Sequence, residues 1–241
     1  MNNLLKNTIL KRIKTTSIED ISLDKNIDIT NYLRYKKYNP IVLDFINIYK
    51  ENFNNQNILN KLSTLKIKTK NKQTDKEGVF NPKNNTITLY TNKDDSEELV
   101  RHKLMHELIH MASRKENYQD GLCYYQEDDK LLLGKGLNEG YTELLNNRYF
   151  SNIGRDYYTK EQVVASKIEE IVGQEVMEDI YFNKHLFDLI NILSDDRKEV
   201  INIIFKIDKI NEDDNIYNEV LDGINKLNNT NKGRHRWFYE R

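Results

Sequence analysis

His106 and His110 flank Glu107 in the stretch His-Glu-Leu-Ile-His, the most chemically informative part of this 241-residue chain. Residues four apart on a helix lie on one face, so both imidazoles can reach a single metal ion. Glu107 lies beside that face, where its carboxylate can take the proton of a metal-bound water. The pattern favours zinc, because catalytic zinc sites use three protein ligands and keep the fourth position for water.

A pair of glutamates supplies candidates for the third ligand. Glu139 and Glu143 are also four residues apart, in a segment with helical character after Gly136, so they share one helix face. One carboxylate could bind the metal while the other accepts a hydrogen bond from a ligating histidine and fixes its tautomer. The spacing of the two residues leaves their roles interchangeable.

The residues before the histidines predict the elements that position them. Residues 78–90 are expected to form two short strands around a Pro/Asn turn, because Ile87 and Leu89 alternate with threonines. A helix is predicted from Glu97 to about Arg114, since its apolar residues recur at helical spacing. Three residues that precede this helix are N-cap candidates: Asp94, Asp95 and Ser96.

The two motifs together resemble the gluzincin branch of the zincin metallopeptidases, to which thermolysin belongs. In that branch His-Glu-x-x-His is followed by a helix with the pattern Asn-Glu-x-x-Ser-Asp. The corresponding residues here are Asn138, Glu139, Thr142 and Glu143, with Thr in place of Ser and Glu in place of Asp. The resemblance covers residues 78–150 and says little about either end of the chain.

The resemblance implies a role for each residue of the motifs. His106, His110 and Glu139 are expected to bind zinc, with Glu107 as the general base. Glu143 is expected to lie behind the ligands and hold one of them by a hydrogen bond. The implied reaction is hydrolysis of a peptide bond, so the expected partner is a peptide or protein substrate.

Several other residues are of the right type for the site but lack a motif. His102 precedes His106 by four residues, and three ligands from one straight helix would strain tetrahedral geometry. We therefore interpret His102 as a structural residue or as a residue behind the ligands. The gap from His110 to Glu139 is longer than in thermolysin, and residues 117–129 within it are expected to form an extra hairpin or loop. Candidates for the oxyanion-stabilising donor rest on residue type alone: Tyr124, Tyr125, Tyr181 and His185.

Three hypotheses for function follow. The first is a zinc-dependent metallopeptidase. The second is a catalytically inactive zincin-fold protein that binds metal or a partner without turnover, and the third is a helical protein in which both motifs are accidental. The presence of Glu107 favours the first hypothesis, because a protein that only binds metal has no chemical need for a general base.

Composition limits the classes of partner. Lys and Arg total 37 against 38 Asp and Glu, a net charge of −1, so no general attraction to nucleic acid or an anionic membrane is expected. The single cysteine, Cys123, rules out an internal disulfide. No stretch approaches the roughly eighteen apolar residues of a membrane span and no secretory signal is visible, so we expect a cytoplasmic protein.

The predicted fold is α+β and zincin-like, with a small twisted sheet packed on the helix that carries the histidines and a mainly helical C-terminal half. Helices are expected over residues 41–53, 58–65, 161–182, 186–193, 199–210 and 216–227, and a strand over 66–70. Three parts are predicted: a mostly helical segment at 1–72, a zincin catalytic core at 73–160 and a helical subdomain at 161–241.

Overall fold

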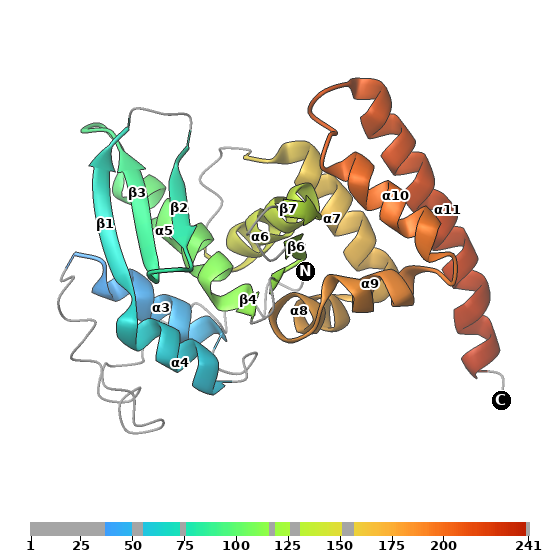
Figure 1. Cartoon of the computed structure of the whole chain (residues 1–241), viewed down its shortest axis with the longest axis horizontal. Coiled ribbons are helices and arrows are strands. Elements are labelled where there is room, and N and C mark those ends of the chain that lie inside the picture. The colour runs from blue at the N-terminus through green and yellow to red at the C-terminus, as the bar shows by residue number, and fades with distance from the viewer. Residues whose placement is uncertain are drawn as a thin grey trace. The chain divides into compact units, whose positions relative to one another are not determined.

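The described residues of this computed structural model form two compact units that divide after Ala112. The first unit extends up to Ala112 and includes Tyr149 and Phe150. The second contains Ser113–Arg148 and the described residues from 157 onward. The chain is α+β and mainly helical, as predicted (Figure 1). The structure describes residues 37–49, 55–72, 76–115, 119–125, 131–150 and 157–239.

The first unit contains a mixed three-stranded sheet in the order β1-β3-β2. Its strands are β1 (Lys66–Asn71), β2 (Gly78–Asn81) and β3 (Thr86–Thr91). The central strand β3 pairs antiparallel with β2, which confirms the predicted hairpin, and parallel with β1. Ile67 of β1 lies opposite Ile87 of β3, and both are buried, so one face of the sheet is apolar.

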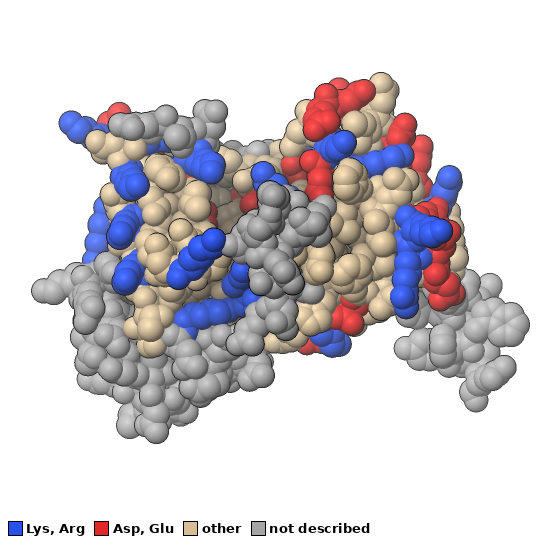
Figure 2. Space-filling model, viewed as in Figure 1, with Lys and Arg blue, Asp and Glu red and all other residues tan. Residues whose placement is uncertain are grey.

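The other side chains of β1 are solvated. Lys66, Lys68 and Lys70 are all exposed, and none of the three strands contains Asp or Glu. Figure 2 shows Lys and Arg side chains gathered over this sheet. Lysines on an edge strand deter pairing with another chain. The strand itself was predicted over residues 66–70.

The helix α5 (Glu97–Ser113) carries both histidines and matches the predicted helix. It begins after Ser96, whose Oγ accepts a hydrogen bond from the Leu99 amide at 3.2 Å, as an N-cap residue does. Leu104 and Leu108 are fully buried. Burial of this apolar stripe holds α5 within the first unit.

Two further helices of the first unit hold α5 through polar contacts. Asp44 accepts a hydrogen bond from Arg101 at 2.6 Å, and Lys61 Nζ donates to the Met111 carbonyl at 3.2 Å. Asp44 belongs to α3 and Lys61 to α4, so α5 is tied to both helices. Of the segment predicted as mostly helical, residues 1–36 lie outside the described part; its helices are α3 (Asn39–Tyr49) and α4 (Asn55–Thr64).

The second unit is mainly helical, which confirms the expected character of the C-terminal half. Residues 161–182 were predicted as one helix, and this is wrong. Gly173, at φ 89°, separates two helices there, because this positive φ cannot continue a right-handed helix. The helices are α6 (Lys135–Tyr149), α7 (Thr159–Val172), α8 (Gln174–Asn183), α9 (Leu186–Leu193), α10 (Arg197–Ile207) and α11 (Asp214–Tyr239). None of the helices in the described ranges is both long and apolar enough to cross a bilayer.

The second unit also contains the hairpin expected between the two motifs. Four short antiparallel strands lie in chain order, with β5 and β6 joined through Gly121 and Leu122. The acidic residues at 127–129 lie outside the described part of the chain. The strands are β4 (Arg114–Lys115), β5 (Gln119–Asp120), β6 (Cys123–Tyr125) and β7 (Leu131–Leu133).

Candidate metal site

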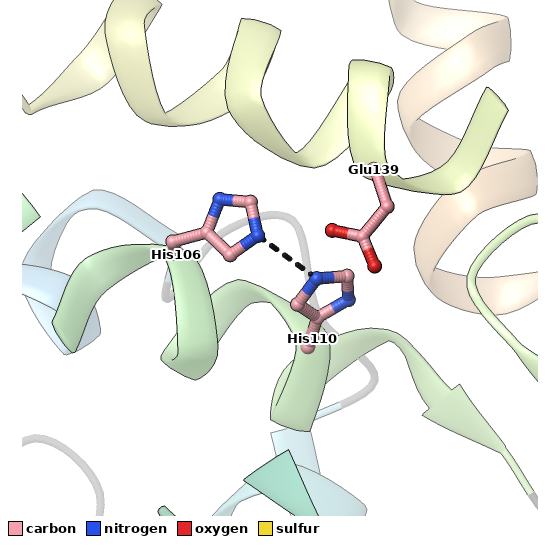
Figure 3. A group of neighbouring side chains, drawn as sticks. All are labelled: His106, His110 and Glu139. Carbon is pink, nitrogen blue, oxygen red and sulfur yellow. Dashed lines mark hydrogen bonds between the residues drawn. The ribbon is translucent and has the colours of Figure 1, made fainter. Parts of the chain in front are cut away.

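His106 and His110 face each other along α5. Their Nε2 atoms are 3.1 Å apart, as the dashed line in Figure 3 shows, and the rings meet edge to face. The two side chains are only 9% and 8% exposed. Two neutral imidazole nitrogens at this distance repel unless a proton or a cation lies between them. The pair can therefore share one proton, as a hydrogen bond between neutral rings, or hold one metal ion.

The spacing of the two nitrogens suits zinc. Two ligands at about 2.1 Å from one ion, at a tetrahedral angle, are roughly 3.4 Å apart. The observed 3.1 Å is close to that value. Neutral imidazole is also the nitrogen ligand that zinc prefers in proteins. The donor set on α5 fits the metal predicted from the sequence.

Glu139 of α6 completes a group of three. Its carboxylate oxygen and one ring nitrogen of each histidine all lie within 4.8 Å of one another. In Figure 3 the carboxylate points toward the imidazoles. These three side chains could hold a metal ion, and three is the number of protein ligands that a catalytic zinc site uses. His102, one turn before His106, is buried and is not part of this group.

The neighbours of Glu139 in the second motif hold α6 in its own unit. Asn138 Oδ1 accepts a hydrogen bond from the Leu122 amide at 2.8 Å. Thr142 Oγ1 donates to the Asn138 carbonyl at 2.7 Å and lies 2.6 Å from the Tyr181 hydroxyl. Thr142 therefore occupies its motif position as a buried, hydrogen-bonded residue. Glu143 is 1% exposed, and a carboxylate so deeply buried requires polar partners.

Glu107 is buried against the backbone of β2. The side chain is only 6% exposed. A Cβ placed on Gly78 would lie 2.6 Å from Glu107 Oε1 and 2.8 Å from its Cγ, well inside van der Waals contact. Only glycine at position 78 leaves room for this carboxylate. The contact was absent from the prediction, because it joins residues from two different elements.

A buried lysine on α5 was also missed. Lys103 Nζ donates hydrogen bonds to Asp95 at 2.6 Å and to the Tyr90 carbonyl at 3.1 Å, and it forms an ion pair with Glu77 at 2.6 Å. The sequence signal was a lysine next to the buried Leu104 in an otherwise apolar helical stripe. A charge at such a position indicates a buried ion pair.

The charges of this network favour one another despite burial. Burial opposes the charge of Lys103, but hydrogen bonds to Asp95 and Glu77 outweigh it and raise the lysine pKa above its ordinary 10.5. Burial likewise opposes the charges of Glu77 and Asp95, but other contacts outweigh it and lower both carboxyl pKa values. Lys103 acts on both carboxyls, Lys72 also acts on Glu77, and the Asn92 amide also donates to Asp95. All three groups are therefore charged at neutral pH.

The residues considered as oxyanion donors have other surroundings. Tyr181 is fully buried, its hydroxyl meets Thr142, and burial raises its pKa. His185 is exposed at the start of α9, where its backbone amide donates to Asp188 at 2.8 Å. Tyr124 and Tyr125 are half-buried in β6. Tyr181 is thus a core residue, and the role of oxyanion donor has no assigned residue.

Comparison with protein-family models, with curated proteins and with solved structures gave no match. The site therefore rests on its own residues and geometry.

Proposed function

We propose that the protein is a zinc-dependent metallopeptidase of gluzincin type, with a zincin-like catalytic core. The observation that carries the proposal is the Nε2–Nε2 distance of 3.1 Å between His106 and His110, with Glu107 buried beside them on the same helix. Glu139 supports it as a third ligand whose carboxylate is already grouped with the imidazoles.

The residues divide the chemistry among them. His106, His110 and Glu139 would hold zinc, which supplies a Lewis acid and lowers the pKa of a bound water toward neutrality. The Glu107 carboxylate takes a proton from the attacking water and then donates it to the leaving amine. Burial of Glu107 and its contact with Gly78 keep bulk water from one side of the carboxylate, which strengthens its interaction with the proton it moves.

Glu107 distinguishes this proposal from a protein that binds zinc without turnover. Two histidines and a carboxylate are sufficient to hold the metal. Glu107 adds a carboxylate next to those ligands on the same helix, where it can take up a proton. General base catalysis requires such a carboxylate, and metal binding alone does not.

Two measurements on the full-length protein test the proposal. Elemental analysis of protein purified without chelator should give near-stoichiometric zinc, and His110→Ala should lose it. Wild type should cleave members of a quenched-fluorescent peptide library. Glu107→Gln should keep both zinc and folded structure and lose cleavage, because a neutral amide cannot accept the proton.

The outcomes separate the hypotheses. Equal zinc in wild type and His110→Ala would contradict the metal site. Zinc-loaded wild type that cleaves no peptide would favour a binding protein, and a Glu107→Gln variant that still cleaves would rule out the general base.

A further inference from the structure

The start of β2 combines a charged residue, Glu77, with a glycine, Gly78, that has no side chain. Glu77 immediately precedes β2 and is held on two sides. Its carbonyl accepts a hydrogen bond from the Tyr90 amide at 2.9 Å, and its carboxylate pairs with Lys103 at 2.6 Å. The first contact fixes Glu77 to β3 and the second fixes it to α5. The next residue is Gly78, which lies against Glu107.

Lys103 is well suited to hold this position rigidly. Its side chain is only 1% exposed, and the three oxygen atoms that its Nζ contacts belong to three different segments. Lys103 also precedes Glu107 by four residues, so the two lie one above the other on the same face of α5. One face of α5 therefore carries both Lys103, which pairs with Glu77, and Glu107, which lies against Gly78.

We propose that Lys103, Glu77 and Gly78 form a clamp that positions the Glu107 carboxylate for proton transfer. The clamp consists of the Lys103–Glu77 ion pair and the side-chain-free backbone at Gly78. This inference rests on the proposed function, because it assigns Glu107 its catalytic task. The three clamp residues are positioning residues, since they act on the reaction only through Glu107.

Gly78→Ala tests the clamp directly. The added methyl would lie 2.6 Å from Oε1, so the carboxylate must shift by about 0.8 Å to reach the 3.4 Å of an ordinary contact. A misplacement of about 1 Å can reduce a rate by about 100-fold. On the best-cleaved peptide of the library we expect kcat to fall about 10- to 100-fold, with KM and zinc content unchanged.

Glu77→Gln should act in the same direction and more weakly. The amide can still accept a hydrogen bond from Lys103 but loses the charge, so β2 is held less firmly and kcat falls about 3- to 10-fold. Two matched controls lie in the second unit. Gly223→Ala meets only the flexible end of Ile203, and Glu219→Gln breaks an exposed pair with Lys206; both should keep wild-type kcat.

A double-mutant cycle separates positioning from a general structural effect. Glu107→Asp shortens this side chain by one methylene, so its carboxylate lies away from the methyl that Gly78→Ala adds. In the Glu107→Asp background, Gly78→Ala should therefore cost less than about 3-fold in kcat. An equal fractional loss in both backgrounds, or full kcat for Gly78→Ala in wild type, would overturn the clamp.

A structural readout tests the clamp independently of activity. Crystal structures of wild type and Gly78→Ala should show the Glu107 carboxylate displaced while His106 and His110 stay in place. An unmoved carboxylate would overturn the clamp even if the protein is a peptidase. Wild type that cleaves no peptide, with the carboxylate displaced in the variant, would contradict the proposed function and leave the clamp intact.

Discussion

The two units position their metal-binding candidates in opposite ways. In the first unit, the buried charge of Lys103 is balanced by the carboxylates of Glu77 and Asp95. In the second unit, Asp208 accepts hydrogen bonds at the start of α6, from the Gly136 amide at 2.7 Å and the Gly134 amide at 2.9 Å. These amides oppose the burial of Asp208 only in part, so its pKa is raised.

The difference has a physical consequence. An ion pair stabilises the charged form of both partners, so a substitution of one partner leaves the other buried and uncompensated. Backbone amides at a helix start stabilise a carboxylate more weakly. We therefore expect the helix that carries the histidines to be more sensitive to single substitutions than the helix that carries Glu139.

The largest effects should come from the ligands themselves. His110→Ala and Glu139→Ala should both abolish tight zinc binding, since two ligands hold the metal poorly. Glu143→Ala should weaken zinc binding by about 10- to 100-fold, as loss of a residue behind the ligands does. Competition with a chromophoric chelator measures all three affinities, with exposed Glu219→Ala as the control. A greater loss for Glu143→Ala than for Glu139→Ala would move the third ligand to Glu143.

The next effect tests the charged support of α5. Lys103→Met leaves Asp95 without its ion-pair partner and Glu77 with Lys72 alone. The free energy of unfolding of the first unit should therefore fall by about 3 kcal/mol. Hydrogen exchange of the amides in α5 and α7 distinguishes the two units. Lys206→Met, which breaks an exposed ion pair with Glu219, should cost less than about 1 kcal/mol. Similar costs for the two lysines would contradict the comparison.

The features that the sequence could predict are those that depend on residues close together in the chain. The strands around the turn after Asn81 and the helix after Ser96 depend on neighbouring residues, so they were predicted correctly. The metal-binding candidates were identified because the two motifs are each contained in one helix. The break at Gly173 had a local signal, a glycine within a helical pattern, which was overlooked.

The supports of the site could not be predicted in the same way. Gly78 contacts Glu107 across 29 residues of chain, and Asp208 reaches Gly136 across 72. No periodicity or local spacing specifies such pairs. The sequence also left the parallel pairing of β1 with β3 undetermined, because an alternating strand fits either edge of a hairpin in either direction.

A smaller effect tests the support of α6. Asp208→Ala removes acceptors for two amides at the helix start, which should cost about 1 kcal/mol. Fraying there lies within one turn of Glu139, so zinc affinity should fall by less than about 10-fold. Asp196 caps α10 in the same manner, through the amides of Lys198 and Glu199. Asp196→Ala should lower the free energy of unfolding by a similar amount without a change in zinc affinity. Equal zinc affinity in the two variants would show that Asp208 does not support the zinc site through α6.

The smallest effect concerns how the folding stability of zinc-free protein changes as the pH falls. The carboxyls of the two units should change it in opposite directions. The pKa values of Glu77 and Asp95 are lowered from their ordinary 4.5 and 3.8. The unfolded chain therefore binds a proton at Glu77 and at Asp95 more tightly than the folded state does. The two ionised carboxylates contribute their full stabilisation of the fold above about pH 4.5, and this contribution is lost as the pH falls through the lowered pKa values. The pKa of Asp208 is raised from 3.8, so the folded state binds its proton more tightly. Its contribution to stability increases as pH falls through the raised value toward 3.8.

Hydrogen exchange from pH 7 to pH 3 should show these opposite trends, after correction for the intrinsic exchange rate. The stability difference between wild type and Lys103→Met, read in α5, should shrink toward low pH, because the protonated carboxyls no longer need the cation. From pH 7 to pH 3, the stability of wild type measured in α6 should rise relative to that of Asp208→Asn, since asparagine has no proton to gain. Parallel trends in the two helices would show that their supports do not differ in charge compensation.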